Sequence, residues 1–255
     1  MPDLRLSMVS YINAKPFQLG LEQSGLINEI ELLLEVPSES ARKLQEREVD
    51  IALVPAASLR EIPSAEIITN FCIGADGEVA SVGLFAELPV EELTHIYLDY
   101  QSRTSVQLLK ILLHEYWQKD VTFLKAYPGY ENDIKGTKGG LIIGDRAIQQ
   151  KGDFQFNYDL SAYWKAHTEL PFVFAVWVAN QSIDTTFEKR LEEAFKLGMT
   201  QKERVIDFYR KEYEQYLDVE HYFQENIEYQ LNPEKLRALD LFLLKINQLE
   251  SRSIA

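Results

Sequence analysis

The chain has 255 residues, of which 46% are hydrophobic and 26% are charged, so it is long enough to bury one sizeable core or two small lobes. Its 40 acidic residues against 26 basic ones give a formal net charge of −14, which excludes the broad positive field that nucleic acid or an anionic membrane would require. We therefore expect a small-molecule partner, and an anionic one stays compatible with this charge where a few donors gather in one cleft.

Cys72 is the only cysteine, so no disulfide can form within the chain, and its cysteine usage does not require an oxidising compartment. The N-terminal residues lack the basic and apolar regions of a secretory signal. The longest apolar run, 170–179, has about half of the roughly 20 residues that a membrane span needs and is typical of a buried strand. We therefore predict a cytoplasmic protein without a membrane partner.

The N-terminal part of the chain alternates predicted strands and helices. In chain order these are a strand over 4–9, a helix that opens near 13–16 and runs toward 24–25, a strand over 31–36, a helix over 41–48, a strand over 50–55, and strands over 67–73 and 79–85 around a turn-rich segment at 74–78. Asn13 stands where the first helix needs its N-cap, and Pro16 falls in its first turn, where proline is tolerated. This alternation predicts an α/β fold with a mainly parallel sheet.

A second alternating set follows and predicts a second lobe. It comprises a strand over 95–98, a turn at 99–102, a helix over 104–117, a strand over 121–125, a turn and helix reaching 138, and a strand over 140–143. The apolar run over 170–178 then returns the chain to the first lobe, and helices are expected near 187–199, 201–215, 219–228 and 233–250. The predicted division is therefore 1–88 plus 176–255 for one lobe and 89–175 for the other.

The run Ser102-Arg103-Thr104-Ser105 stands at the start of the predicted helix over 104–117. With Ser102 as N-cap, the free N–H groups of the first turn, the helix dipole and three hydroxyls would form an anion cradle, and Arg103 would add a bidentate contact to a carboxylate. A capped helix with a solvated arginine is an equally open interpretation of this segment. Ligands in α/β folds lie beyond the carboxyl ends of the strands, so such helix starts should face the cleft between the lobes.

Three further polar residues are candidates for the same cleft, and each also has a purely structural interpretation. Asn13 offers an amide to a ligand or caps its helix, and Ser81 offers a hydroxyl or bonds to neighbouring backbone. Asp145 follows a strand and is interpreted first as a helix cap, which does not exclude a contact in the cleft. From the residues alone, the structural interpretation is favoured for all three.

No metal or cofactor is expected. The four histidines are scattered without metal-ligand spacing, and the glycine motifs of nucleotide-binding loops and the Gly-x-Ser-x-Gly motif of serine hydrolases do not occur. The aromatic residues between 187 and 242 recur at helical spacing beside acidic residues, so we attribute them to the packing of amphipathic helices.

Three segments in this order, Ser10-Tyr11-Ile12-Asn13-Ala14-Lys15-Pro16, Gln101-Ser102-Arg103-Thr104-Ser105 and 170–178, resemble the chorismate dehydratase family of the futalosine route to menaquinone. Further matches lie at 50–55, 142–145, 158–160 and Trp164, so the resemblance covers nearly the whole chain. It implies a two-lobed fold of the type II periplasmic-binding-protein kind with a ligand cleft between the lobes. It also implies a hydro-lyase that acts on chorismate, a dicarboxylate, without a cofactor.

The resemblance assigns site residues as well. The family's site asparagine and serine fall on Asn13 and Ser81, which we expect to be catalytic. The expected substrate-binding residues are Ser10, Ser102, Arg103, Thr104, Ser105 and Asp145. At 72–75 this chain has Cys-Ile-Gly-Ala where many relatives carry one or two serines, so a hydroxyl contact from Gly74 or Ala75 is in doubt.

The implied reaction removes the C3 hydrogen and the C4 hydroxyl of chorismate and gives 3-[(1-carboxyvinyl)oxy]benzoate and water. None of the matched residues is an ordinary general base near neutral pH. We therefore predict that the enolpyruvyl carboxylate of the substrate takes the proton, while Asn13 and Ser81 hold that side arm and 102–105 holds the ring carboxylate.

Two alternatives stay open. One is a non-catalytic binding protein or sensor for a small carboxylate, and the other is the sister enzyme, dihydroxynaphthoate synthase. The sister enzyme typically opens with a Pro-Cys-Pro-Asn-Asp motif, from which 10–16 departs. The sequence gives no indication of the oligomeric state.

Overall fold

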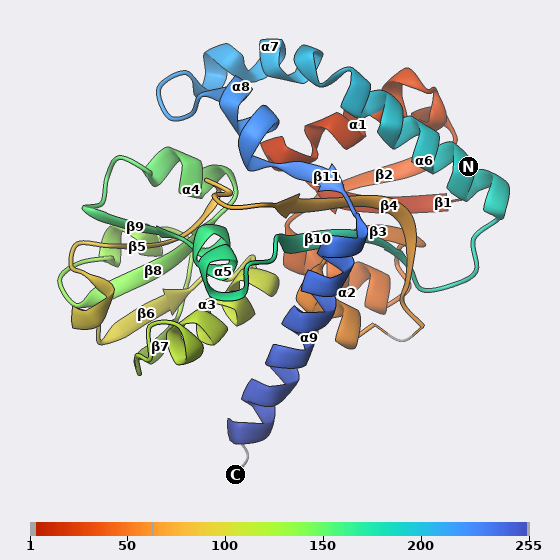
Figure 1. Ribbon diagram of the computed structural model, residues 1–255. Helices are drawn as coiled ribbons and strands as arrows, with labels where there is room; N and C mark the ends of the chain where they lie inside the picture. The colour runs from red at the N-terminus through yellow and green to blue at the C-terminus, as the bar shows by residue number, and fades with distance from the viewer. Residues whose placement is uncertain (1–3, 63, 254–255) are drawn as a thin grey trace.

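The computed structural model describes residues 4–62 and 64–253, so 1–3 and 254–255, at the two ends of the predicted first lobe, lie outside the described residues. Two sheets with their helices form two lobes (Figure 1). The half built on the six-stranded sheet is called the first lobe, and the half built on the five-stranded sheet is the second. The predicted α/β class is confirmed, but the prediction of a mainly parallel sheet is wrong, because each sheet mixes parallel and antiparallel pairs.

The sheet of the first lobe has the strand order β11-β4-β10-β3-β1-β2. Its strands are β1 (Leu4–Val9), β2 (Ile30–Glu35), β3 (Ile51–Pro55), β4 (Glu66–Ala75), β10 (Phe172–Ala179) and β11 (Glu228–Gln230). β1 pairs in parallel with β2 and β3, whereas β10 runs antiparallel to β3 and β4. All 8 residues of β10 are buried, because helices lie on both faces of the sheet, and this accounts for its uninterrupted apolar sequence.

Helices α1, α6 and α7 lie over one face of this sheet, and α2 and α9 lie over the other (Figure 1). The bounds are η1 (Ile12–Ala14), α1 (Lys15–Gln23), η2 (Leu26–Asn28), α2 (Pro37–Gln45), η3 (Ala56–Arg60), α6 (Thr185–Thr200), α7 (Lys202–Tyr213), α8 (Val219–His221), the π-helical turn η6 (Tyr222–Asn226) and α9 (Pro233–Ser253). α1 and α6 touch through their backbones, since a Cβ atom on Gly20 would lie 2.0 Å from the Ala194 carbonyl oxygen. This close packing fixes α1 and, with it, the turn η1 that carries Asn13.

The second lobe has the strand order β7-β6-β8-β5-β9. Its elements are β5 (Val82–Ala86), η4 (Val90–Glu92), β6 (His95–Leu98), α3 (Thr104–Glu115), β7 (Thr122–Lys125), η5 (Tyr130–Asp133), β8 (Lys138–Ile143), α4 (Asp145–Gln150), β9 (Phe156–Asp159) and α5 (Leu160–Thr168). β6 is parallel to β7 and β8, and β5 is antiparallel to β8 and β9.

The structure differs from the predicted elements at several places. β4 continues through Gly74 and Ala75 because both pair with β10, so the turn expected at 74 begins later. Ser81 lies just before β5 instead of inside a strand. The helix expected over 219–228 is replaced by α8, η6 and β11, because β11 pairs with β4. β9 and α5 were not predicted, and the helix expected before 138 is the short turn η5.

The division of the chain between lobes stays a proposal. β5 belongs to the second sheet and β10 to the first, so the chain crosses between the sheets within 76–81 and 160–171. In the described part of the chain, no helix combines the length and the apolar character needed to cross a membrane.

Candidate active site

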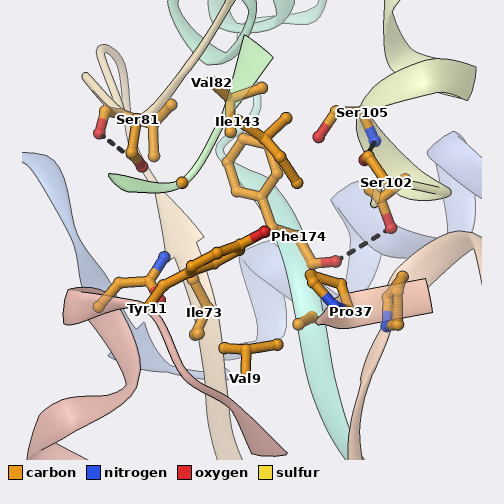
Figure 2. A pocket seen from close by; sticks show the side chains of 16 residues that line it. Val9, Tyr11, Pro37, Ile73, Ser81, Val82, Ser102, Ser105, Ile143 and Phe174 are labelled. Carbon is orange, nitrogen blue, oxygen red and sulfur yellow. Dashed lines mark hydrogen bonds between the residues drawn. The ribbon is translucent and has the colours of Figure 1, made fainter. Parts of the chain in front are cut away.

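A cavity lies between the two sheets, where β1, β3 and β8 end and α3 begins (Figure 2). Its empty volume is about 520 Å³, part of which is open to solvent. The 16 lining residues are Val9, Tyr11, Asn13, Pro37, Pro55, Ile73, Val79, Ser81, Val82, Ser102, Thr104, Ser105, Ile143, Gly144, Phe174 and Ala175. Among these described lining residues none carries a charged side chain. The cavity is therefore a neutral site that offers hydroxyl, amide and backbone groups.

Asn13 lies in this cavity, but it does not cap α1 as predicted. The N-cap of α1 is Ala14, because residues 12–14 form the separate turn η1. Asn13 is 9% exposed, and its Oδ1 atom has no hydrogen-bond partner in the described structure. Its backbone carbonyl accepts a hydrogen bond of 2.8 Å from the hydroxyl of Tyr229. A buried amide oxygen is thus left for a ligand.

Ser81 is linked to Asn13 through a tyrosine of the C-terminal region. The hydroxyl of Tyr222 donates to Ser81 Oγ at 3.1 Å and is also hydrogen-bonded to the side chain of Asn13. Tyr222 is fully buried, and burial raises the pKa of its hydroxyl, so it stays a neutral donor. Attributing the aromatic residues at 187–242 to packing alone misses this polar contact.

The turn before Ser81 is held by Asp159, which was not predicted to act near the site. One carboxylate oxygen accepts from the N–H groups of Val79 at 3.0 Å and Ala80 at 2.7 Å. Ala80 has a φ of +61°, a left-handed conformation that a non-glycine residue adopts at a cost. Burial raises the pKa of Asp159 to about 6. This carboxylate therefore stabilises the backbone that presents Ser81.

The start of α3 forms the opposite wall, with Ser102 and Ser105 across the cavity from Ser81 (Figure 2). Ser102 Oγ accepts from the Ser105 N–H at 3.0 Å, so the expected capping bond forms, but the N-cap residue is Arg103 and not Ser102 as predicted, because the helix begins at Thr104. Thr104 Oγ1 donates to the Phe174 carbonyl oxygen at 3.1 Å and accepts from a backbone N–H of the first lobe. The Thr104 hydroxyl therefore links the second lobe to the first through hydrogen bonds.

The structure does not bring Ser10 or Arg103 to this cavity. Arg103 forms an ion pair with Glu61 at 2.6 Å and lies outside the lining. Ser10 is exposed, and its N–H donates to the Glu35 carbonyl. A motif does not determine the direction of a side chain at a strand end or helix start. Both residues were therefore predicted to bind substrate although their side chains lie elsewhere.

Asp145 reaches across to the first lobe instead of capping α4. The residue before the helix is Gly144, and Asp145 Oδ1 accepts a 3.1 Å hydrogen bond from the Ile12 N–H. The hydroxyl of Tyr213 also bonds this carboxylate, whose pKa is raised by burial. Asp145 therefore acts on the backbone next to Asn13.

Tyr11 makes a second contact between the lobes that was not predicted. Its hydroxyl donates to Gln101 Oε1 at 2.7 Å, and the same oxygen accepts from Arg146 at 3.1 Å. Arg146 in turn pairs with the buried Asp99 at 2.6 Å. The ring of Tyr11 packs on Gly144, where a Cβ atom would lie 2.8 Å from it. These contacts close the lobes over the cavity.

Comparisons with known proteins identify the family of this chain. Residues 4–248 match the family described as menaquinone biosynthesis. The chain belongs to the menaquinone biosynthesis family. Within it, the chain is 32% identical over 197 residues to the chorismate dehydratase of Thermus thermophilus, a match that covers 68% of each chain.

Solved structures of low sequence identity share the fold of this family member. A protein from Archaeoglobus fulgidus aligns with a TM-score of 0.74 at 15% identity over 97% of both chains. The periplasmic aliphatic sulphonate-binding protein SsuA from Escherichia coli aligns with a TM-score of 0.59 at 13% identity, over 96% of this chain and 92% of that one. The expected periplasmic-binding-protein-like fold is confirmed.

The segment 72–75, where the family resemblance led us to expect serines, contributes one residue to the cavity lining. Of 72–75, only Ile73 is in the lining. A Cβ atom on Gly74 would lie 2.8 Å from the Phe172 carbonyl oxygen, on the side of the buried Lys235. A hydroxyl at Gly74 would therefore point away from this cavity. Across 4–62 and 64–253, no group of three or more potential metal-ligating side chains was found.

Proposed function

We propose that this protein is a chorismate dehydratase, a hydro-lyase that converts chorismate to 3-[(1-carboxyvinyl)oxy]benzoate and water in the futalosine route to menaquinone. Its family and its Thermus relative support the assignment. The structural observation that carries it is the neutral cavity, whose described lining combines Asn13 and Ser81 with the start of α3 and contains no carboxylate, histidine, lysine or arginine. The cytoplasmic location stays a prediction.

A neutral cavity suits a reaction in which the substrate brings its own base. The tyrosine in the lining is no substitute, because burial raises the pKa of Tyr11. In the proposed step, the enolpyruvyl carboxylate takes the C3 hydrogen as a proton, and the electron pair of that bond moves toward the ring carboxylate. The C4–O bond then breaks, so that the hydroxyl and one proton leave as water while the ring becomes aromatic.

The protein contributes positioning and charge stabilisation. Ser102 and Ser105, at the positive end of α3, would hold the ring carboxylate, which takes up charge as the C3 hydrogen leaves. On the opposite wall, Asn13 and Ser81 would together hold the side arm and the neighbouring C4 hydroxyl in the reactive conformation. The contacts of Tyr11 and Asp145 between the lobes would keep water from the intermediate.

The test is to incubate the purified full-length protein with chorismate, without added metal or cofactor, and to follow the products by chromatography and mass spectrometry. A no-protein control corrects for spontaneous decay of chorismate. Formation of the dehydrated aromatic ether is the expected result. Unchanged chorismate with saturable binding would overturn the proposal in favour of a sensor, and neither turnover nor binding would reject chorismate as the ligand.

A further inference from the structure

Tyr222 occupies a central position between the two side chains that the proposed reaction uses. It lies in the π-helical turn η6, and such turns occur often at functional sites. Its side chain is fully buried, and its hydroxyl contacts both Ser81 and Asn13. Tyr222 does not line the cavity, so any influence on a ligand passes through these two residues.

The hydrogen bonds of this tyrosine have a fixed direction. Its single hydrogen is donated to Ser81 Oγ at 3.1 Å, so the phenol oxygen is left to accept from Asn13. An amide can donate only through its nitrogen. The Asn13 Nδ2 atom therefore faces Tyr222, and this agrees with the buried Oδ1 atom that lacks a partner in the described residues.

Asn13 and Ser81 thereby offer the cavity a neighbouring hydrogen-bond acceptor and donor. The Oδ1 atom of Asn13, a residue of the lining, is an acceptor without a partner in the described structure. Ser81 already accepts from Tyr222, and its own hydrogen makes only a long 3.4 Å contact with the Val79 carbonyl oxygen, so it is free to turn to a ligand. A donating Ser81 hydroxyl is strengthened by the bond it accepts, because hydrogen bonds in a chain polarise one another.

An acceptor beside a donor matches a ligand that carries a hydroxyl next to an arm ending in a carboxylate. Chorismate has this pattern, since its C4 hydroxyl is adjacent to the C3 carbon that bears the enolpyruvyl ether. The geometry points to Tyr222 as a positioning residue that makes Asn13 accept from the substrate hydroxyl and makes Ser81 donate to the side-arm carboxylate. This inference rests on the proposed dehydratase activity and names the substrate group to which each residue forms a hydrogen bond.

The test compares Tyr222→Phe with Tyr158→Phe in steady-state kinetics with chorismate. Tyr158 serves as the control, because its hydroxyl is also hydrogen-bonded, accepting from the Val90 N–H at 2.9 Å, but contacts neither Asn13 nor Ser81 and lies outside the cavity lining. We expect Tyr222→Phe to lower kcat by about tenfold or more with KM changed less than about threefold, and Tyr158→Phe to retain the wild-type kcat. In an Asn13→Ala background, Tyr222→Phe should lower kcat by a smaller factor than in the wild type, since only the part of its effect that passes through Ser81 remains.

The outcomes separate this inference from the proposed function. Without wild-type turnover the proposed function fails. With wild-type turnover, an unchanged kcat in Tyr222→Phe, or a loss that adds fully to that of Asn13→Ala, overturns the role of Tyr222 alone. If circular dichroism shows that Tyr222→Phe does not fold, the inference is tested instead by the kcat values of Asn13→Ala, Ser81→Ala and the double variant. Non-additive losses support coupling through the tyrosine, and additive losses overturn it.

Discussion

Asp145 Oδ1 accepts a hydrogen bond of 3.1 Å from the backbone N–H of Ile12, so a carboxylate of the second lobe is bonded to the residue directly before Asn13. Asp145→Ala should lower kcat and reduce the free energy of unfolding by about 1–3 kcal/mol, because the Ile12 N–H and the Tyr213 hydroxyl lose a buried partner. Asp145→Asn keeps an acceptor oxygen of the same shape and should restore most of both quantities. Steady-state kinetics and urea unfolding of the two variants check this. If Asp145→Asn lowered kcat and the free energy of unfolding as much as Asp145→Ala does, the negative charge of Asp145, rather than its acceptor oxygen, would be the feature that both quantities require.

Replacing Asn13 removes the buried amide that faces the cavity. We expect Asn13→Ala to lower kcat by about a hundredfold while KM changes less than about threefold, because the residue is proposed to orient a reacting group rather than to supply most of the binding energy. Initial rates over a range of chorismate concentrations give both constants. An unchanged kcat would reject the role assigned to Asn13.

Asp159 should make stability depend on pH in a defined direction. Its pKa is raised by burial from 3.8 to about 6, so the folded state binds a proton more tightly than the unfolded state. The contribution of this group to stability is therefore greatest below the unfolded pKa and falls as the pH rises through the folded one. The difference in unfolding free energy between the wild type and Asp159→Asn should narrow by up to roughly 3 kcal/mol between pH 4 and 6.5. Urea titrations at several pH values measure it, and a difference that widens with pH would contradict the prediction.

The crossing of α1 and α6 should not tolerate a methyl group. A Cβ atom on Gly20 would lie 2.0 Å from a backbone oxygen, so Gly20→Ala should destabilise the protein by about 3 kcal/mol. Gly152→Ala is the matched control, since no atom lies within 4 Å of its Cβ position, and it should change stability by less than about 0.5 kcal/mol. Chemical unfolding of both variants is the measurement. A mild effect at Gly20 would mean that the two helices can separate at little cost.

The sequence was informative where the determinants are local. The apolar strands at 4–9 and 95–98 lie where expected, and Ser102 makes its capping bond, because hydropathy patterns and caps depend on neighbouring residues. Asn13 and Ser81 reach the cavity that the family resemblance implied. The hydrogen bond between Tyr222 and Ser81 joins residues 141 positions apart, so no local sequence pattern could predict it.

The different placement of neighbouring candidates has a similar cause. Arg103 and Thr104 are neighbours in one motif, yet Arg103 pairs with Glu61 outside the cavity, whereas Thr104 lines the cavity and bonds the first lobe. Their directions depend on how the two lobes meet, and that arrangement is set by packing between segments far apart in the chain. A motif therefore identified the right helix start without telling which of its side chains face the ligand.

The neutral lining of the cavity has a consequence for how such an enzyme arises. Its fold is shared with SsuA, which is named as an aliphatic sulphonate-binding protein. When the substrate carries the reactive base, holding it in one conformer is itself the catalytic act, and no proton-transferring side chain has to be acquired. With the proposed mechanism, a cleft of this fold needs only to bind such a substrate in the reactive conformer to act as a lyase, so the chemistry of the bound molecule separates catalysis from simple binding.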